Sequence, residues 1–348
     1  MNPSKIRYER LYAGQEVELR RTAGEATPLC CVAFASYFNS GKPRAFGSTF
    51  FAKAGIAAYY VVPTSNNWYQ TAEMQPLIEA LLAHAGGRPL LGYGSSMGGF
   101  AALAYARALN LKSVIALSPQ VAVSDALVGD FETRWRREAA LLIDHQPDAR
   151  EGLHPALSGI VAYDPLHRGD RRHAEMILGV SGHQLSALRV PCAAHPVGRA
   201  LAANSVLSGL VKAIINGEPA EAATAAARAA YRSSPARATF TVSRFVKRRQ
   251  RRQQPSPWAE ALKARYGFVD QPKRRPGKAT PAAVGSGSAR PAVPLNRLIR
   301  EVVELLDAGN AAQALAQLEP LSQAHPDHPR IGKLLQRARR RAAPGSRR

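Results

Sequence analysis

Short apolar runs alternate with helical patterns along the first 220 residues of the chain. The apolar runs are six to ten residues long, and they occupy 28–37, 55–62, 88–94, 113–118, 159–164 and 186–193. Runs of this length and of these residue types predict buried strands. Ahead of them, "IRYERLYAGQEVELRRT" (6–22) predicts a hairpin that turns at Ala13-Gly14.

Helical patterns fill most of the gaps between these runs. The patterns at 71–86, 99–110 and 197–217 have apolar residues at helical spacing, and the first ends on Gly86. Strands that alternate with crossover helices predict an α/β fold with a mainly parallel, doubly wound sheet covered on both faces. The longest interruption, 119–157, carries a charged helical pattern and is expected to form a lid over the carboxyl edge of the sheet.

The character of the chain changes near its last third. Residues 1–230 carry 22 Lys and Arg against 18 Asp and Glu, whereas residues 231–348 carry 25 against 7. Residues 231–294 are basic and rich in Pro, Gly and Ala, so they are expected to form a largely disordered linker. The chain is therefore expected to consist of an α/β domain at 1–230, this linker, and a small helical segment at 295–341.

Part of the helical segment resembles the second half of a tetratricopeptide repeat. In "AGNAAQALAQLEPLSQAHPDHP" the residues Gly309, Ala314, Leu318 and Pro326 stand at matching spacings. A single unit is visible, whereas such repeats normally stack in threes or more. We expect a tetratricopeptide-like helical hairpin at 295–341 that can bind a protein partner.

The linker contains a strongly basic run, "RFVKRRQRR" (244–252), with six basic residues out of nine. Such a run can contact a nucleic-acid backbone, an anionic membrane surface or an acidic partner, or it can simply be solvated. No RNP motif, zinc finger or helix-turn-helix pattern indicates sequence-specific readout. A non-specific polyanion contact through 244–252 is the most that the run supports.

The stretch "LLGYGSSMGGFAALAYARA" (90–108) places small residues between an apolar run and a helical pattern. A Walker A loop ends in Lys followed by Ser or Thr, and this stretch contains no lysine. A dinucleotide fingerprint needs a third glycine where Met97 stands and an acidic residue about 20 positions further on, and residues 101–124 contain no acidic residue. Gly94-Ser95-Ser96-Met97-Gly98 instead fits G-x-S-x-G, a strand-to-helix turn that presents Ser96 as a nucleophile.

Through this motif and the order of the predicted elements, residues 25–217 resemble the α/β-hydrolase superfamily of serine hydrolases. The resemblance implies a triad in the chain order serine, acid, histidine, with the last two at the carboxyl ends of later strands. His195 follows the last predicted strand and precedes the last large helix, so it is the expected general base. Asp164, at the end of "GIVAYDP", is the preferred acid. The alternatives are Asp170, which looks like the N-cap of the next helix, and Asp125.

The resemblance also implies an oxyanion hole made partly of the backbone N–H of Met97. A second donor should come from the loop after the run at 28–37, which reads Ser36-Tyr37-Phe38-Asn39. This loop lacks the His-Gly glycines of many lipases and esterases. Ser36, or else Tyr37, is the expected donor.

These features predict a serine hydrolase of the carboxylesterase or thioesterase kind, which cleaves a small-molecule or acyl-carrying substrate through an acyl-enzyme on Ser96. No cofactor or metal is expected. The alternatives are an acyltransferase that uses the same triad, and a catalytically silent scaffold that binds a protein or a polyanion through its tail. The N-terminal segment lacks a signal-peptide core, the chain has three cysteines and no run of about 18 apolar residues, and a cytoplasmic protein is therefore expected.

Overall fold

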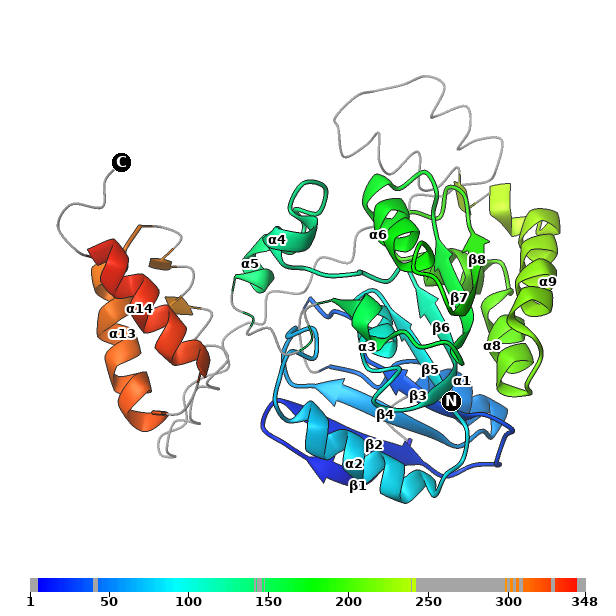
Figure 1. The fold of residues 1–348 in the computed structure, drawn as a ribbon, viewed down its shortest axis with the longest axis horizontal. Coiled ribbons are helices and arrows are strands. Elements are labelled where there is room, and N and C mark those ends of the chain that lie inside the picture. The colour runs from blue at the N-terminus through cyan, green and yellow to red at the C-terminus, as the bar shows by residue number, and fades with distance from the viewer. Residues whose placement is uncertain are drawn as a thin grey trace, which may run out of the picture. The chain divides into compact units, whose positions relative to one another are not determined.

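The computed structural model describes residues 6–39, 43–140, 142, 146, 148–238, 240–241, 298, 301–302, 305–306, 309–326 and 329–342. The chain divides into two compact units, residues 1–266 and residues 267–348. The first unit holds the sheet and its helices, and the described part of the second includes two long helices (Figure 1).

The first unit is built on one sheet of eight strands. They are β1 (Glu9–Ala13), β2 (Val17–Thr22), β3 (Cys30–Phe34), β4 (Ala58–Pro63), β5 (Leu90–Ser95), β6 (Leu111–Leu117), β7 (Ser158–Tyr163) and β8 (Gln184–Arg189). Their order in the sheet is β1-β2-β4-β3-β5-β6-β7-β8. Strands β3 to β8 run parallel, whereas the β1–β2 hairpin joins β4 antiparallel. This arrangement confirms the predicted mainly parallel sheet of α/β-hydrolase type.

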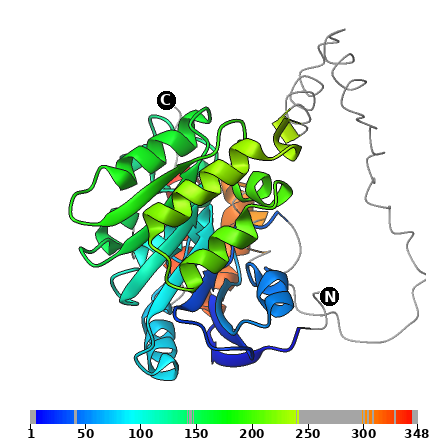
Figure 2. The ribbon, with the colours of Figure 1, turned by 90° about the vertical axis from the view of Figure 1, so that its right-hand side faces the viewer.

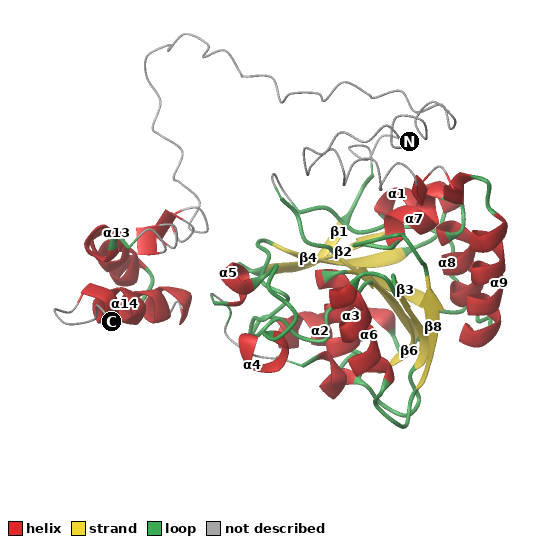
Figure 3. Ribbon diagram, turned by 90° about the horizontal axis from the view of Figure 1, so that it is seen from above, coloured by secondary structure: helices red, strands yellow, loops and turns green. Residues whose placement is uncertain are grey.

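Helices cover both faces of the sheet (Figure 3). One face carries α2 (Met74–Ala85), α3 (Met97–Ala104) and α6 (Arg168–Leu178). The other carries α1 (Ser48–Ala54), α7 (Gly198–Ala203), α8 (Leu207–Ile215) and α9 (Ala220–Ser233). Alternate side chains of the central strands enter the two cores, as Val61 and Val62 of β4 do. Because these strands are buried on both faces, each is a continuous apolar run in the sequence.

The predicted helices are present, with two differences. The helix expected at 99–110 ends earlier, because α3 ends at Ala104. α2 ends at Gly86, whose φ of 60° is the left-handed conformation that glycine adopts at helix ends. The single helix expected at 197–217 is instead two, because the chain leaves the helical conformation between α7 and α8, where Ser205 has a φ of 59°.

The loops after the parallel strands meet at the carboxyl edge of the sheet, where α/β folds build their sites. Ser96 follows β5, Gln120 follows β6, Asp164 and Asp170 follow β7, and His195 follows β8. The topology therefore brings together residues that are up to 99 positions apart in the sequence.

The long interruption after β6 contains the short helices α4 (Asp125–Val128) and α5 (Arg136–Ala139) and a 3-10 helix at Ala149–Gly152. Residues 141, 143–145 and 147 lie outside the described part of the chain. The segment supplies Trp135 to the wall of a cavity beside Ser96. Its interpretation as a lid stays a prediction.

The second unit contains α13 (Ala311–Ala324) and α14 (Pro329–Ala342), which pack against each other. Ala314 and Leu318 of α13 are buried, as are Leu334 and Ala338 of α14. The assignment of this helical pair to the tetratricopeptide type stays a prediction. Of the expected linker at 231–294, only 231–238 and 240–241 are described, and α9 runs across its start.

Within the described residues, no helix combines the length and the apolar character needed to cross a membrane. Cys30 and Cys31 are buried in β3 as small core residues. No disulfide joins the described cysteines.

Candidate active site

Ser96 occupies a strained turn between β5 and α3. Its φ is 54°, a left-handed conformation that is costly for a residue other than glycine. A side chain at Gly94 would collide with the carbonyl group of Gly98, and a side chain at Gly98 would collide with that of Phe34. The small residues two places on either side of Ser96 are therefore what allows β5, α3 and β3 to approach so closely.

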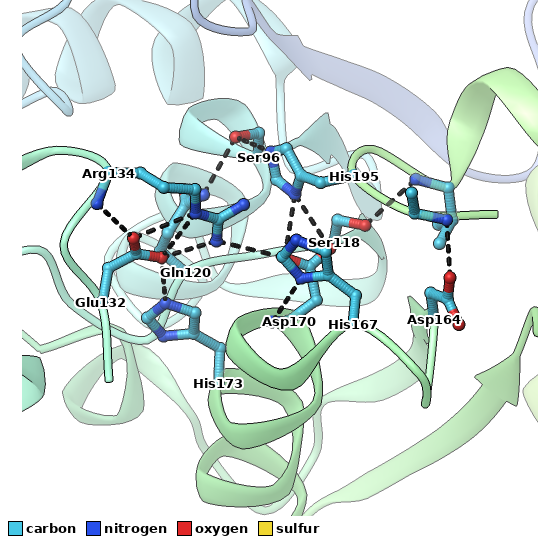
Figure 4. A network of polar contacts seen from close by, with 12 residues as sticks. Ser96, Ser118, Gln120, Glu132, Arg134, Asp164, His167, Asp170, His173 and His195 are labelled. Carbon is cyan, nitrogen blue, oxygen red and sulfur yellow. Dashed lines mark hydrogen bonds and ion pairs between the residues drawn. The ribbon is translucent and has the colours of Figure 1, made fainter. Parts of the chain in front are cut away.

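Ser96 begins a chain of hydrogen bonds that continues through His195 to Asp170 (Figure 4). Ser96 Oγ lies 2.9 Å from His195 Nε2. On the other side of the ring, His195 Nδ1 lies 3.0 and 2.9 Å from the two carboxylate oxygens of Asp170. A carboxylate can only accept, so Nδ1–H donates to Asp170, and Nε2 is left to accept the proton of the serine hydroxyl. This is the geometry in which a serine can be activated as a nucleophile.

The carboxylate of Asp170 is held ionised. Burial, which leaves the side chain 1% exposed, would raise its pKa, but the hydrogen bond and the charge of His195 help to hold the pKa well below its usual range. Arg134 adds an ion pair at 3.2 Å. Asp170 also lies in the first turn of α6, where the helix dipole favours negative charge. A permanently charged acid keeps the His195 ring in one tautomer.

Asp164, the triad acid preferred from the sequence, does not contact His195 in the structure and instead bonds backbone N–H groups. Its Oδ1 accepts hydrogen bonds from the N–H groups of Leu166 and Cys192, at 2.9 and 3.2 Å, and its Oδ2 accepts from the N–H of Ala194, at 2.6 Å. Cys192 and Ala194 have positive φ values of 65° and 54°. Asp164 therefore ties down the strained loop that carries His195, and it does not bond the imidazole.

Two further interpretations of acidic residues are corrected. Asp170 is not the N-cap of α6; His167 is, and its Nδ1 accepts from the N–H of Asp170 at 3.1 Å. The carboxylate of Asp170 is thus free of capping and faces His195. Asp125, the third candidate, is exposed and paired with Arg136 at 3.2 Å.

Gln120 is a polar contact of the serine that the sequence reading missed. It is fully buried, its Nε2 donates to Ser96 Oγ at 3.0 Å, and its Oε1 accepts from the indole N–H of Trp68 at 3.4 Å. The orientation of the amide is set by these two partners. The sequence did contain one indication of this role: Gln120 stands just past the end of β6, at the carboxyl edge of the sheet, where α/β folds place functional residues.

A second layer of charge supports Asp170. Arg134 bonds both carboxylate oxygens of Glu132, and His173 Nε2 lies 3.1 Å from Glu132 Oε2. Burial would raise the pKa of Glu132, but the contacts with His173 and Arg134 lower it to about 2. Burial lowers the pKa of His173. The ring is therefore neutral, with Nε2–H donating to Glu132 and Nδ1 accepting from the N–H of Val121 at 3.1 Å.

Of the expected oxyanion donors, Met97 directly follows the serine in the chain, and Ser36 comes from the loop after β3. Met97 is the first residue of α3, so its N–H has no acceptor within the helix. Ser36 follows β3, whose end packs directly on Gly98, and it lines the same cavity as Ser96. Its Oγ is buried and has no hydrogen-bond partner among the described residues. Tyr37, the alternative, donates its hydroxyl to Glu138 at 2.9 Å.

A cavity of about 970 Å³ opens beside Ser96 and His195. Aromatic side chains form much of its wall, among them Phe46, Phe50 and Trp135. Trp68 does not line it; this residue is fully buried behind the wall, 5.4 Å from the Trp135 ring. No group of acidic, histidine or cysteine side chains in the described part of the chain is arranged to hold a metal ion.

Neither the known family models nor the curated proteins include a match to this chain. Several solved structures have a similar fold. The capsule O-acetyltransferase of Neisseria meningitidis serogroup A is 12% identical, with a TM-score of 0.48 over 62% of this chain and 97% of that chain. An α/β serine hydrolase without a lid from Xanthomonas campestris is 15% identical, with a TM-score of 0.37 over 57% and 89%. A bacterial brefeldin A esterase is 13% identical, with a TM-score of 0.39 over 66% and 77%.

Proposed function

We propose that the chain is a serine hydrolase that cleaves an ester or a thioester through a covalent acyl-enzyme on Ser96. The observation that carries the proposal is the continuous hydrogen-bonded chain from Ser96 through His195 to Asp170, built on a strained strand-to-helix turn. Strain of this kind persists where the surrounding structure enforces it, and it is typical of functional residues.

In the first half of the reaction, Ser96 Oγ attacks the carbonyl carbon and His195 Nε2 takes the hydroxyl proton. Asp170 stabilises the imidazolium that forms. When the tetrahedral intermediate collapses, the bond from carbon to the leaving oxygen or sulfur breaks, and His195 returns the proton to the leaving group. In the second half, a water molecule attacks the acyl-enzyme with His195 as its base, and the products are the free acid and Ser96.

The negative charge of the intermediate needs donors that are already in position. Met97 N–H fits this role because it follows Ser96 at the first position of α3, and Ser36 fits because it lines the same cavity as Ser96. We assign Ser36 as the second donor on this ground. Gln120, which contacts Ser96 Oγ itself, is assigned to orienting the nucleophile.

The cavity supports a substrate with an apolar acyl part. Its aromatic wall offers apolar surface, and its volume of about 970 Å³ lies near the upper end of ordinary small-molecule sites. Two positive side chains, Arg44 and Arg199, also line it, and none of the described residues that line it is acidic. This balance of charge favours neutral or anionic esters over cationic ones.

Acyl transfer to an acceptor other than water is the second candidate function. The volume of the cavity supports it, because there is room for an acceptor next to a short acyl chain. The two activities are separated by adding small alcohols to the reaction. A transferase converts the acyl group into a new ester as the alcohol concentration rises, whereas a strict hydrolase continues to release the acid.

The first test is covalent labelling by a fluorophosphonate probe, which reacts with activated serines. We expect the wild-type chain to be labelled and Ser96→Ala to be unlabelled, with labelling of His195→Ala slower by about three orders of magnitude. Ser95→Ala is the matched control and should be labelled as fast as the wild type. A folded wild type that does not react would overturn the proposal and favour a catalytically silent scaffold.

A further inference from the structure

A second cavity, of about 610 Å³, is lined in part by Pro191, at the start of the loop that carries His195. It is formed between β8, the edge strand of the sheet, and α9, which Figures 1 and 2 show running alongside that edge. Pro165 and Pro191 contribute to its lining. It shares no lining residue with the cavity at Ser96, so it is a separate site.

Four arginines line this cavity, namely Arg189 from β8, Arg228 and Arg232 from α9, and Arg237. Among the described residues that line it, one is acidic, Glu221. Arg189 donates to the hydroxyl of Tyr163 and Arg228 to the carbonyl of Ala187, each at 3.2 Å. Within the described part of the chain, none of the four forms an ion pair with a carboxylate. The described lining residues therefore carry a net positive charge, on four exposed guanidinium groups against one carboxylate.

The same cavity has a buried hydroxyl with no partner. Thr224 of α9 is 3% exposed and lines the cavity, and its Oγ1 has no hydrogen bond with any described residue. A threonine inside a helix usually donates this hydroxyl to the carbonyl four residues earlier. Buried polar groups without partners are rare because each is costly. Thr224 therefore adds to the cavity wall a buried hydroxyl whose acceptor is not found among the described residues.

We propose that this cavity binds a small molecule that carries two or more phosphate groups. Arginine side chains present forks of donors that match phosphate oxygens, and like charges held in one cavity repel each other until an anion fills it. The guanidinium groups come from two walls, β8 and α9. Tetrahedral phosphates accept from several directions at once, so they fit this arrangement better than planar carboxylates do.

The test is calorimetric titration of the full chain with inorganic pyrophosphate at fixed salt. We expect saturable binding of one pyrophosphate per chain. In Arg228→Gln/Arg232→Gln the affinity should fall at least tenfold. The matched control is Arg7→Gln/Arg10→Gln, which removes the same charge from the exposed hairpin at the other edge of the sheet and should bind as the wild type does.

Two further variants separate the cavity from other sources of binding. Thr224→Val should lower the affinity several-fold without lowering the melting temperature, because it removes a hydroxyl that has no partner among the described residues. Lys247→Gln/Arg248→Gln/Arg249→Gln neutralises part of the basic run and should leave the binding unchanged. Citrate, a carboxylate of similar charge, should bind more weakly than pyrophosphate.

The proposal is overturned if Arg228→Gln/Arg232→Gln binds pyrophosphate as the wild type does, or if the affinity falls equally in Arg7→Gln/Arg10→Gln. Loss of binding in Lys247→Gln/Arg248→Gln/Arg249→Gln would also overturn the proposal, because pyrophosphate would then bind to the basic run and not to the cavity. Citrate that binds as tightly as pyrophosphate would also overturn it, because the cavity would then respond to charge and not to phosphate.

Discussion

The hydroxyl group of Ser96 has two hydrogen-bonding neighbours, one an acceptor and the other a donor. It donates to His195 Nε2, at 2.9 Å, and accepts from the Gln120 amide, at 3.0 Å. A hydroxyl has one proton to donate, so an acceptor on one side and a donor on the other fix its rotation. The resting orientation of the nucleophile thus depends on Gln120 as well as on the histidine.

Gln120→Met keeps the volume of the side chain and removes its donor. We expect kcat to fall by about ten- to a hundredfold, which corresponds to one lost hydrogen bond to the reacting group. The measurement is steady-state hydrolysis of an activated ester that the wild type accepts. Gln120→Glu is the companion variant, because its carboxylate cannot donate to Ser96 Oγ and should lower kcat at least as much. If both variants keep the wild-type kcat, Gln120 has only a packing role.

The two aspartates after β7 should respond differently to loss of charge. Asp170→Asn removes the charge next to His195 Nδ1, and we expect the labelling rate to fall by roughly 10⁴-fold. Asp164→Asn leaves the imidazole contacts in place but removes an acceptor of the Ala194 N–H, so it should mainly lower the free energy of unfolding, by about 1–3 kcal/mol.

The comparison is made at a temperature where both variants are folded, with labelling rates and urea unfolding measured side by side. Equal loss of labelling rate in the two variants would contradict the separate roles of the imidazole contact and the loop contact.

At the scale of elements, a buried ion-pair network joins the segment after β6 to α6. Glu132 comes from that segment, His173 and Asp170 come from α6, and Arg134 lies between them. Removing one member of such a network leaves an uncompensated buried charge, which typically costs about 3–5 kcal/mol. The network therefore fixes the segment beside the triad and keeps Asp170 in place.

The lowered pKa of Glu132 makes this network sensitive to acid. Its folded pKa of about 2 lies below its ordinary value of 4.5, so the stability that it contributes is present above about pH 4.5 and is lost as the pH falls towards 2. At neutral pH we expect Glu132→Gln to be less stable than the wild type by about 3 kcal/mol. As the pH falls from 4.5 to 2, the two unfolding free energies should converge.

Urea unfolding at a series of pH values measures this difference. Asp125→Asn is the control, because Asp125 is paired with Arg136 on the surface and its loss should leave a curve parallel to that of the wild type. A constant gap between wild type and Glu132→Gln down to pH 2 would argue against the ionised Glu132 as the source of the stability.

The sequence was sufficient to predict the strands and helices that show a clear hydrophobic periodicity, and to predict the turn at Ser96. The apolar runs became strands because they are buried on both faces, and Gly94 and Gly98 are small because backbone groups approach them. The acid was harder to predict. Both Asp164 and Asp170 follow β7, and only the path of the chain into α6 decides which carboxylate reaches His195. Gln120 and Arg134 were missed because contacts across the fold, and not local patterns, bring them to the site.

At the scale of the molecule, the first compact unit extends beyond the boundary expected at residue 230. α9 runs to Ser233, and Tyr231 is 3% exposed, with its hydroxyl donating to the carbonyl of Pro191 at 3.2 Å. Pro191 begins the loop that leads to His195. The end of α9 therefore belongs to the same packed unit as the candidate active site.

Two truncated chains test where the catalytic unit ends. The chain 1–266 keeps α9 whole, and we expect it to react with the fluorophosphonate probe as fast as the full chain does. The chain 1–230 loses Tyr231, and burial of an aromatic side chain is worth about 3–5 kcal/mol, so its melting temperature should fall by roughly 10 °C. Thermal unfolding and labelling of both chains give the answer. Slow labelling of a well-folded 1–266 would mean that residues 267–348 act on the site, because the packing that holds His195 is complete without them.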